Sequence, residues 1–361
     1  MPAFIVLIII SSLLANQVIK KIVLREVSQT AYRYGHLAQS QLEEGLTLAR
    51  SLSQSFTAQR ELNDISRNQI NHVLKKIVEE NPQIMGAWTV WEPNMLDGKD
   101  ADFKGIDGSD PEGRFVPYWN RVGSVNQSVC ADYNNTDVSG DYYNKPIKLK
   151  KEVVMDPMVY PIGDQKIMAV SFCVPMISSD GTIYGVAGID LPMDYFQKMV
   201  AKINPYPNSY AYLISSNASF VSHPDENAVG KFLGDLDNDP EKSFMKESVI
   251  KGKEFMIEKT SFLSKKPSYQ VFVPFSLGRS DSFWSLGIVI DKSQINKYAM
   301  NMITVQIILY IVVVITMIFI IVSVSRKLVA PIKQLVETFK DLSEGEGDLK
   351  TRIHVDTADE V

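Results

Sequence analysis

The sequence predicts an α+β fold: a long N-terminal helix leads into two similar α/β modules, with an apolar helix at each end. Three observations carry this prediction. No proline occurs between Pro2 and Pro82, so a long helix is allowed there. Short apolar runs separated by Gly, Asn, Asp and Pro follow, as in strands joined by turns. Sequence landmarks in the first block of such runs then recur in a second block.

The two ends of the chain carry the apolar helices. Residues 302–324 form a run of 23 residues without charge, long enough as a helix to cross a hydrocarbon core of roughly 30 Å. We therefore expect a membrane span there. Residues 1–19 also lack charge but include polar side chains. We expect a first membrane anchor over 1–19 in preference to a cleaved signal peptide, because no basic residue precedes the apolar stretch.

Basic residues after each apolar run give conflicting indications of orientation. Positive charge favours the cytoplasmic side of a membrane, yet it follows both runs, so one cluster must lie outside if both runs span. The clusters are Lys20, Lys21 and Arg25 after the first run and Arg326, Lys327 and Lys333 after the second.

Composition excludes several functional classes. The net charge of −5 over 361 residues gives no polybasic signature, so a nucleic-acid partner is not expected. Four dispersed histidines and two cysteines, Cys130 and Cys173, have no metal-ligand spacing, and a disulfide between the cysteines stays open. No phosphate-binding glycine loop, nucleophile elbow or zinc helix is present. We therefore expect no cofactor, no metal and no catalysis.

A single long helix is expected over residues 20–80. A stripe of small and apolar residues recurs along its first half at alternating spacings of four and three, which resembles a heptad and is weakened in the middle by Gln41 and Gly45. Such a stripe packs either on a partner helix, as in a homodimer, or on the helix's own domain. Its members are Val27, Ala31, Tyr34, Ala38, Gln41, Gly45, Leu48 and Leu52.

Two α/β modules are expected next, over residues 81–200 and 201–298. Apolar runs bounded by turn residues predict four strands in each. In the first module they cover residues 83–91, 114–119, 166–177 and 182–191, and in the second residues 209–215, 220–222, 268–275 and 283–290.

The two modules repeat each other in detail. Val174-Pro175 recurs as Val273-Pro274, an offset of 99, and Ile189-Asp190 recurs as Ile290-Asp291, an offset of 101. In both blocks a turn separates the two landmarks. This agreement favours a tandem repeat of one module over a chance likeness between amphipathic strands.

With these features the chain resembles the double Cache sensory region of bacterial chemoreceptors and sensor kinases, whose modules are PAS-like. The resemblance rests on two tandem modules between two membrane spans, and on short motifs in each module. The motifs are residues 113–119 (GRFVPYW), 141–143 (DYY), 174–176 (VPM), 185–190 (GVAGID), 212–214 (YLI), 221–224 (VSHP) and 230–231 (GK).

Residues 325–361 resemble the start of a HAMP linker. Pro331-Ile332 follows the second apolar run at the usual place, and residues 347–353 (GDLKTRI) resemble the second conserved stretch. Because HAMP linkers are cytoplasmic, the resemblance implies that residues from about 20 to 300 lie on the extracytoplasmic side of the membrane. It also implies a multi-pass protein of the bacterial inner membrane, a homodimer, and cytoplasmic signalling partners that bind a region after Val361.

The resemblance further implies a small-molecule site in the first module. Amino-acid-sensing members hold the ligand carboxylate with a cation two residues before an aromatic, and the ligand ammonium with an Asp at the end of the last strand. This pattern assigns ligand contacts to Trp119, Arg121, Tyr142, Tyr143, Met158, Tyr160 and Asp190.

One position departs from the family pattern. The carboxylate-holding position falls at Gly140, which has no side chain. Either Arg114 or Arg121 supplies the missing cation from another strand, or the ligand is an amine without a carboxylate. Asp190 also has a purely structural alternative, in which it caps the helix that follows.

The function implied is a transmembrane sensory receptor that binds a small ligand, an amine or amino acid, and signals through HAMP, with chemotaxis as the expected output. Two alternatives stay open. The chain could be the input half of a histidine kinase or a cyclic-nucleotide-signalling enzyme, or it could bind a periplasmic binding protein in place of a free ligand.

Overall fold

The computed structural model describes residues 2–162, 165–233, 235, 241–280 and 282–343. The chain divides into two units, Lys21–Ile295 and the two chain ends, Met1–Lys20 with Asn296–Val361. The second conserved stretch expected for the HAMP linker, residues 347–353, lies outside the described residues.

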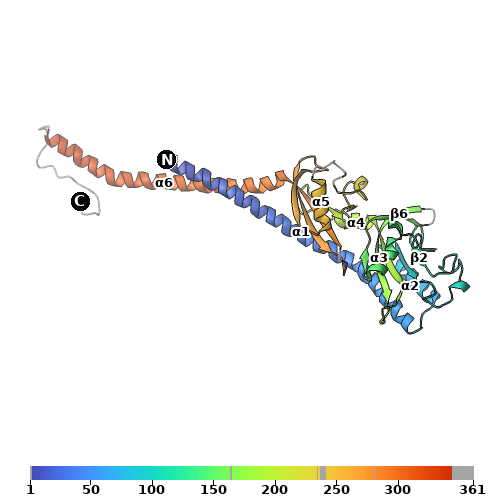
Figure 1. The fold of residues 1–361 in the computed structure, drawn as a ribbon. Helices are drawn as coiled ribbons and strands as arrows, with labels where there is room; N and C mark the ends of the chain where they lie inside the picture. The colour runs from blue at the N-terminus through green and yellow to red at the C-terminus, as the bar shows by residue number, and fades with distance from the viewer. Residues whose placement is uncertain (1, 163–164, 234, 236–240, 281, 344–361) are drawn as a thin grey trace. The chain divides into compact units, whose positions relative to one another are not determined.

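The first module, referred to below as the distal module, is a seven-stranded antiparallel sheet of order β3-β2-β1-β7-β6-β4, with β5 also paired to β6 (Figure 1). Its helices are α2, which contacts β1 and β2, and α3, which contacts β6 and β7. The bounds are α2 Arg67–Glu80, β1 Gly86–Trp91, β2 Pro117–Asn120, β3 Asn126–Val129, α3 Asp141–Leu149, β4 Val153–Val154, β5 Met158–Ile162, β6 Gln165–Ile177, β7 Ile183–Pro192 and α4 Met193–Ala201.

The second module, referred to below as the proximal module, is a five-stranded antiparallel sheet of order β10-β11-β12-β8-β9. The bounds are β8 Tyr210–Ile214, β9 Phe220–Ser222, α5 Lys242–Ile250, β10 Phe255–Thr260, β11 Pro267–Ser276 and β12 Phe283–Asp291. All eight strands expected from the sequence are present as β1, β2, β6, β7, β8, β9, β11 and β12. Four strands were not predicted, β3, β4, β5 and β10; β4 has only two residues, and β3 and β10 carry several polar side chains.

The prediction of one helix over residues 20–80 is wrong. Helix α1 spans Pro2–Glu61, and α2 begins only at Arg67. Between them Asn63 adopts a left-handed φ of 54°, a conformation that asparagine tolerates. Ser66 then caps α2 by accepting a hydrogen bond from Gln69 N. The chain therefore turns without proline, which the sequence analysis had taken as the main helix breaker.

The buried stripe of α1 departs from the predicted heptad in its second half. Leu42, Leu46 and Ala49 are fully buried, whereas Gln41, Gly45 and Leu48 are only half-buried. The stripe thus follows the 3.6-residue period of a straight helix, not the 3.5-residue period of a supercoil. It packs on the helix's own domain, in a core shared by both sheets.

The chain ends contain one helical segment long and apolar enough to cross a membrane. This is Ile303–Lys327, within α6 (Lys292–Ser343), and it includes most of the run expected at 302–324. Among the described residues no second segment meets that test, so the expected first span over 1–19 stays a prediction. Pro331, expected at the start of the linker, lies within α6.

Candidate functional site

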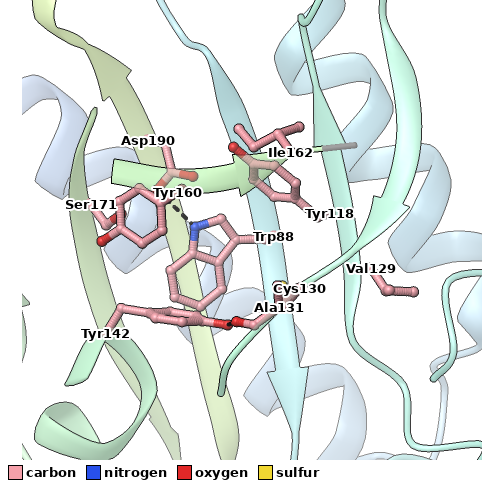
Figure 2. A pocket seen from close by; sticks show the side chains of 10 residues that line it. All are labelled: Trp88, Tyr118, Val129, Cys130, Ala131, Tyr142, Tyr160, Ile162, Ser171 and Asp190. Carbon is pink, nitrogen blue, oxygen red and sulfur yellow. Dashed lines mark hydrogen bonds between the residues drawn. The ribbon is translucent and has the colours of Figure 1, made fainter. Parts of the chain in front are cut away.

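A pocket opens on the face of the distal sheet that also carries α3 (Figure 2). Aromatic side chains dominate its wall, and Asp190 is the only charged residue among those that line it. The lining residues are Trp88, Tyr118, Val129, Cys130, Ala131, Tyr142, Tyr160, Ile162, Ser171 and Asp190.

Strand register brings these side chains together. Trp88 of β1 lies opposite Gly188 of β7, and Asp190 lies opposite Ser171 of β6. A Cβ at residue 188 would lie 2.1 Å from the indole of Trp88. Only glycine therefore lets the indole lie across β7 and reach Asp190, which is two residues along the same face. Trp88 Nε1 donates a 3.0 Å hydrogen bond to Asp190 Oδ1.

Asp190 is a carboxyl group almost out of contact with water, at 4% exposure. Burial raises the pKa of Asp190 above its ordinary value, and favourable interactions with Ser171, Trp88 and Tyr118 offset this only in part. Tyr118 lies near enough to Asp190 to favour the ionised form of that carboxyl group. The Tyr118 hydroxyl nevertheless makes no hydrogen bond of ordinary geometry among the described residues. Among the described residues that line the pocket, none is a cation that would neutralise Asp190.

Two phenol hydroxyls in the pocket have no hydrogen-bond partner among the described residues, those of Tyr118 and Tyr160. Burial, and then the charge of Asp190, raises the pKa of both tyrosines well above the ordinary value, so both are neutral and can donate. Tyr142 differs, because its hydroxyl donates to Ala131 O at 2.6 Å. Its ring meets those of Trp88 and Tyr160 edge to face, with centroids 5.1 and 6.0 Å away.

Three of the seven residues assigned from the sequence line this pocket: Tyr142, Tyr160 and Asp190. Tyr142 comes from the first turn of α3, not from a strand. Asp190 does not cap a helix, since it lies inside β7 and α4 begins only at Met193. The structural alternative proposed for Asp190 is therefore wrong.

Trp119 and Arg121 lie away from the pocket. Trp119 points to the α2 face of the sheet, where Nε1 donates to Asn71 Oδ1 at 3.1 Å. Arg121 donates to the carbonyl of Val78 near the end of α2. Successive side chains of a strand face opposite sides of its sheet, and it is Tyr118, one residue before Trp119, that faces the pocket. The structure thus places Tyr118, and not Trp119, in the lining of this pocket.

Tyr143 and Met158 border the site without lining it. The Tyr143 hydroxyl donates to Glu92 Oε1 and accepts from Arg114 Nη2. Arg114 also donates to Trp91 O. Met158 on β5 packs against the same hydrophobic cluster as the pocket residues. Neither Arg114 nor Arg121 therefore supplies the pocket with the cation that the family pattern places at the position of Gly140.

The absence of a side chain at Gly140 is a steric requirement. A Cβ there would lie 2.0 Å from Asn135 O and 2.9 Å from Asn144 Nδ2. The first contact is with backbone, which cannot move aside as the end of a side chain can. A lysine or arginine at residue 140 would need a different loop.

Sequence reasoning missed seven lining residues, among them Trp88, Tyr118 and Ser171. A signal for Trp88 was present, because β1 was predicted and Gly188 in the repeated GVAGID motif marks a close approach. Tyr118 would have followed from choosing the other face of β2. Cys130 and Ala131 follow β3, a polar strand that the sequence analysis did not detect.

Both cysteines are free thiols and both are buried. Burial raises the pKa of Cys130 and Cys173 well above the ordinary value, so neither is a reactive thiolate. Within the described residues, no group of three or more His, Cys, Asp or Glu side chains is arranged to hold a metal ion.

The cavity has a volume of about 30 Å³, room for one or two water molecules. A larger ligand therefore needs lining side chains to move apart. Tyr160 and Ile162 come from β5, for which the described residues show pairing with β6 alone. Displacement of β5 therefore breaks sheet hydrogen bonds on one side only, which makes β5 a wall able to open.

Fold and site together define a two-module α+β domain with a small aromatic pocket in its distal module. The chain belongs to the Cache domain family, because a double Cache (dCache_1) profile matches residues 15–298, and a HAMP domain profile matches residues 323–361.

Curated relatives are bacterial methyl-accepting chemotaxis proteins. PscA of Pseudomonas syringae is 23% identical over 99% of this chain and 50% of its own length. PctB of Pseudomonas aeruginosa is 24% identical over 62% of this chain and 35% of its own length. TlpQ of the same organism is 30% identical over 37% of this chain and 20% of its own length. The chain thus corresponds to half or less of each relative.

Solved structures share the fold. The extracellular domain of the histidine kinase mmHK1S-Z2 is 26% identical, with a TM-score of 0.66, over 76% of this chain and 99% of that domain. The related domain mmHK1S-Z3 is 22% identical, with a TM-score of 0.69, over 78% of this chain and 98% of that domain. The ligand-binding domain of PctB in complex with L-Arg is 19% identical, with a TM-score of 0.52, over 74% of this chain and 95% of that domain.

Proposed function

We propose that this chain is the sensory part of a chemotaxis receptor and that its distal module binds a small ammonium ligand against Asp190. The observation that carries the proposal is the buried carboxylate of Asp190, which has aromatic neighbours and no cation beside it. A ligand ammonium supplies the missing charge through a charge-assisted hydrogen bond. The faces of Trp88 and Tyr142 add cation–π attraction.

The pocket chemistry favours an amine over an α-amino acid. A ligand carboxylate taken into the pocket would lose its water, and none of the lining residues is Lys or Arg. An unpaired buried charge is costly. Only neutral donors, such as the Tyr118 and Tyr160 hydroxyls, could meet it. An amine carries the charge that Asp190 needs and no second charge to desolvate.

Matched ligand pairs test this choice. Thermal unfolding of residues 21–295 is followed with phenethylamine against phenylalanine and with agmatine against arginine, each pair differing by one carboxylate. A ligand at 100 times its dissociation constant stabilises the domain by about 2.7 kcal/mol. We expect an amine to stabilise it and its amino acid to do so less. Stronger stabilisation by both amino acids would reject the amine assignment while leaving a ligand-binding role for Asp190.

The known complexes make amino acids the direct competitor. The ligand-binding domain of PctB has been solved with L-Arg and with L-Gln, and that of the Pseudomonas fluorescens chemoreceptor CtaA with L-isoleucine. These domains are 19% identical or less to this chain, so they support its fold but do not identify its ligand. The thermal unfolding measurements with the matched ligand pairs distinguish an amine from an amino acid.

For the output, we infer signalling across a membrane to cytoplasmic chemotaxis proteins. The methyl-accepting relatives support this, as does the HAMP match that follows Ile303–Lys327. The proposed arrangement is an inner-membrane protein with residues 1–19 and 303–327 as spans and the Cache region outside. Its role is sensing, not catalysis. Cysteine accessibility to a membrane-impermeant reagent at Ser55, compared with Ser343, tests the orientation.

A homodimer is part of the same proposal. Helix α1 leaves Ile22, Tyr32 and Leu37 exposed, away from the stripe that it buries against its own domain. Apolar residues on a helix surface favour association with a second copy. Disulfide cross-linking of a Leu37→Cys variant in membranes would detect the dimer, and an exposed position outside α1, such as Ser124→Cys in the loop before β3, is the control.

The histidine-kinase alternative keeps one supporting observation. Two of the solved domains with this fold come from histidine kinases, so the input fold does not select the output. The sequence relatives favour the chemotaxis receptor. The reading frame after Val361 in the source gene distinguishes a methyl-accepting region from a kinase core.

A further inference from the structure

A second and larger cavity lies where α1 meets both modules. It has a volume of about 400 Å³, within the usual range of small-molecule sites. Its floor is α1 from Arg50 to Glu61, one wall is the connection after α3 at residues 150–152, and the other wall is the end of β6. Arg279, from the loop between β11 and β12, brings the proximal module to the same cavity.

Positive charge converges on this cavity from three separate parts of the chain. Arg50 comes from α1, Lys150 and Lys151 from the connection after α3, and Arg279 from the proximal module. Two carboxylates, those of Glu61 and Glu152, lie among them. The cavity is therefore net positive in a chain of net charge −5, which concentrates small anions there.

Both carboxylates already have hydrogen-bond partners. Glu152 is almost buried and accepts two bonds of 2.9 Å from Arg50, to Oε2 from Nε and to Oε1 from Nη2. Its Oε1 also accepts from the backbone nitrogen of Arg279 at 2.5 Å. Glu61 Oε1 accepts from Ser179 N at 2.7 Å. The Arg50–Glu152 pair is thus a fixed part of the cavity wall.

Two other cations that line the cavity, Lys150 and Arg279, have no such side-chain hydrogen bonds among the described residues. The ammonium of Lys150 and the guanidinium of Arg279 donate no hydrogen bond to any residue in the described part of the chain, and both side chains are exposed. The same cavity is lined by the apolar residues Val174, Pro175 and Ile177 of β6. Two cations and an apolar strip in one cavity suit a short aliphatic chain that carries two carboxylates.

We propose that this cavity is a second ligand site and that it binds a small aliphatic dicarboxylate. One carboxylate pairs with the fork of Arg279 and the other with Lys150, while the methylene chain lies along Val174 and Ile177. A ligand held in this way bridges the distal and proximal modules. Its occupancy therefore favours whichever arrangement of the two modules brings Lys150 and Arg279 to the matching separation.

The test uses the full chain in lipid nanodiscs, titrated with malonate, succinate and glutarate at constant ionic strength by calorimetry. Saturable binding of at least one diacid is expected. Arg279→Gln and Lys150→Gln should each weaken it by about tenfold, the loss of one charged contact. Lys148→Gln is the matched control, because this exposed lysine of the same helix end does not line the cavity. It should change binding by less than about twofold.

Three results would overturn the proposal. They are no saturable binding of any of the three diacids to the unaltered protein, undiminished binding in both variants, and inorganic phosphate binding as tightly as the best diacid. Melting without ligand checks that each variant folds, and Lys150→Gln, at an exposed helix end, keeps the test decisive if Arg279→Gln unfolds. Asp190→Asn should leave diacid binding unchanged, so the two sites fail or succeed separately.

Discussion

In both the distal and the proximal module an aromatic ring lies across a glycine of the neighbouring strand, but the residues around that ring differ. In the distal module the ring of Trp88 covers Gly188, and in the proximal module the ring of Tyr212 covers Gly287. Each aromatic residue and its glycine are paired neighbours in adjacent strands, β1 with β7 and β8 with β12. The two modules can therefore be compared position by position.

At these matched positions the distal residues are small or acidic and the proximal ones are bulky or neutral. Cys173 and Gly188 correspond to Phe272 and Gly287, and Ser171 and Asp190 correspond to Gln270 and Val289, by the pairing of β6 with β7 and of β11 with β12. Asp190, the acidic residue of the candidate site, thus has a valine as its counterpart.

Hydrogen bonding follows the same division. Trp88 Nε1 donates to the carboxylate of Asp190, whereas the Tyr212 hydroxyl donates to Gln270 Oε1 at 2.9 Å. In the proximal module a neutral pair satisfies itself, and rings pack around Tyr212, with centroids of Phe220, His223 and Phe272 5.5, 5.5 and 5.8 Å away. One fold thus serves as a polar pocket in one copy and as a packed core in the other.

The largest expected effect comes from making the proximal module resemble the distal one. Val289→Asp places a carboxylate among apolar residues where Gln270 and Tyr212 already satisfy each other. We expect the free energy of unfolding to fall by about 4 kcal/mol, because a buried charge without a partner is costly. Chemical unfolding of residues 21–295 measures it, with Val289→Thr as the polar but uncharged control. A free energy of unfolding within about 0.5 kcal/mol of that of the unaltered domain would show that position 289 accepts a charge, and that the two modules do not differ there as argued.

The reverse exchange acts on binding more than on stability. Asp190→Val gives the distal site the proximal residue, and we expect it to weaken the best amine by about 100-fold, the loss of a buried charge pair. Stability should change by less than about 2 kcal/mol, since an apolar side chain also removes the cost of burying a carboxylate. Asp190→Asn keeps an acceptor for Trp88 and isolates the charge. Retained affinity in both variants would remove Asp190 from the site.

The comparison also shows what the sequence could and could not predict. Apolar runs bounded by turn residues identified eight strands, because strands that are buried on both faces are apolar along most of their length. The repeat was detected, and its Val-Pro offset of 99 agrees with the strand pairing. Its Ile-Asp offset of 101 does not, because Asp291 lies two residues beyond Val289, the true counterpart of Asp190. Only the register shows that the two acidic residues are not equivalent.

The residues of the candidate site also fall into those that local sequence could predict and those that it could not. Tyr142, Tyr160 and Asp190 came from local motifs, and the structure places them in one pocket. The choice between Tyr118 and Trp119 depended on which face of β2 meets α3, and that is fixed by pairing with β1 and not by local sequence. The break of the long helix at Asn63 was likewise a matter of turn chemistry without proline.

Substitutions at the matched glycines Gly188 and Gly287 test whether the two modules also differ in how tightly the covering ring is packed. A Cβ would approach the covering ring to 2.1 Å at Gly188 and 2.3 Å at Gly287. The ring of Trp88 borders a cavity and can shift, whereas that of Tyr212 is enclosed by other aromatic rings. We expect Gly287→Ala to cost about 3 kcal/mol and Gly188→Ala about 1 kcal/mol. The same unfolding assay measures both, and equal costs would mean that the distal ring is no freer than the proximal one.

The smallest expected effect lies in the pH dependence of stability, where only the distal module has a buried acid at the matched position. Because burial raises the pKa of Asp190 above its unfolded value, the folded state holds this proton more tightly. Its contribution to stability is full below the unfolded pKa and is lost as pH rises through the folded pKa. The slope cannot exceed about 1.4 kcal/mol per pH unit for one proton. Asp190→Asn should flatten the curve in that window, and Asp156→Asn, which changes a carboxyl that accepts from Ser216 Oγ and Asn217 N, is the control. Amine affinity should move in the opposite sense and strengthen with rising pH, because the ligand binds the ionised carboxylate. Parallel curves for the unaltered domain and Asp190→Asn would show that Asp190 titrates alike in both states, and that its burial alone does not distinguish the modules.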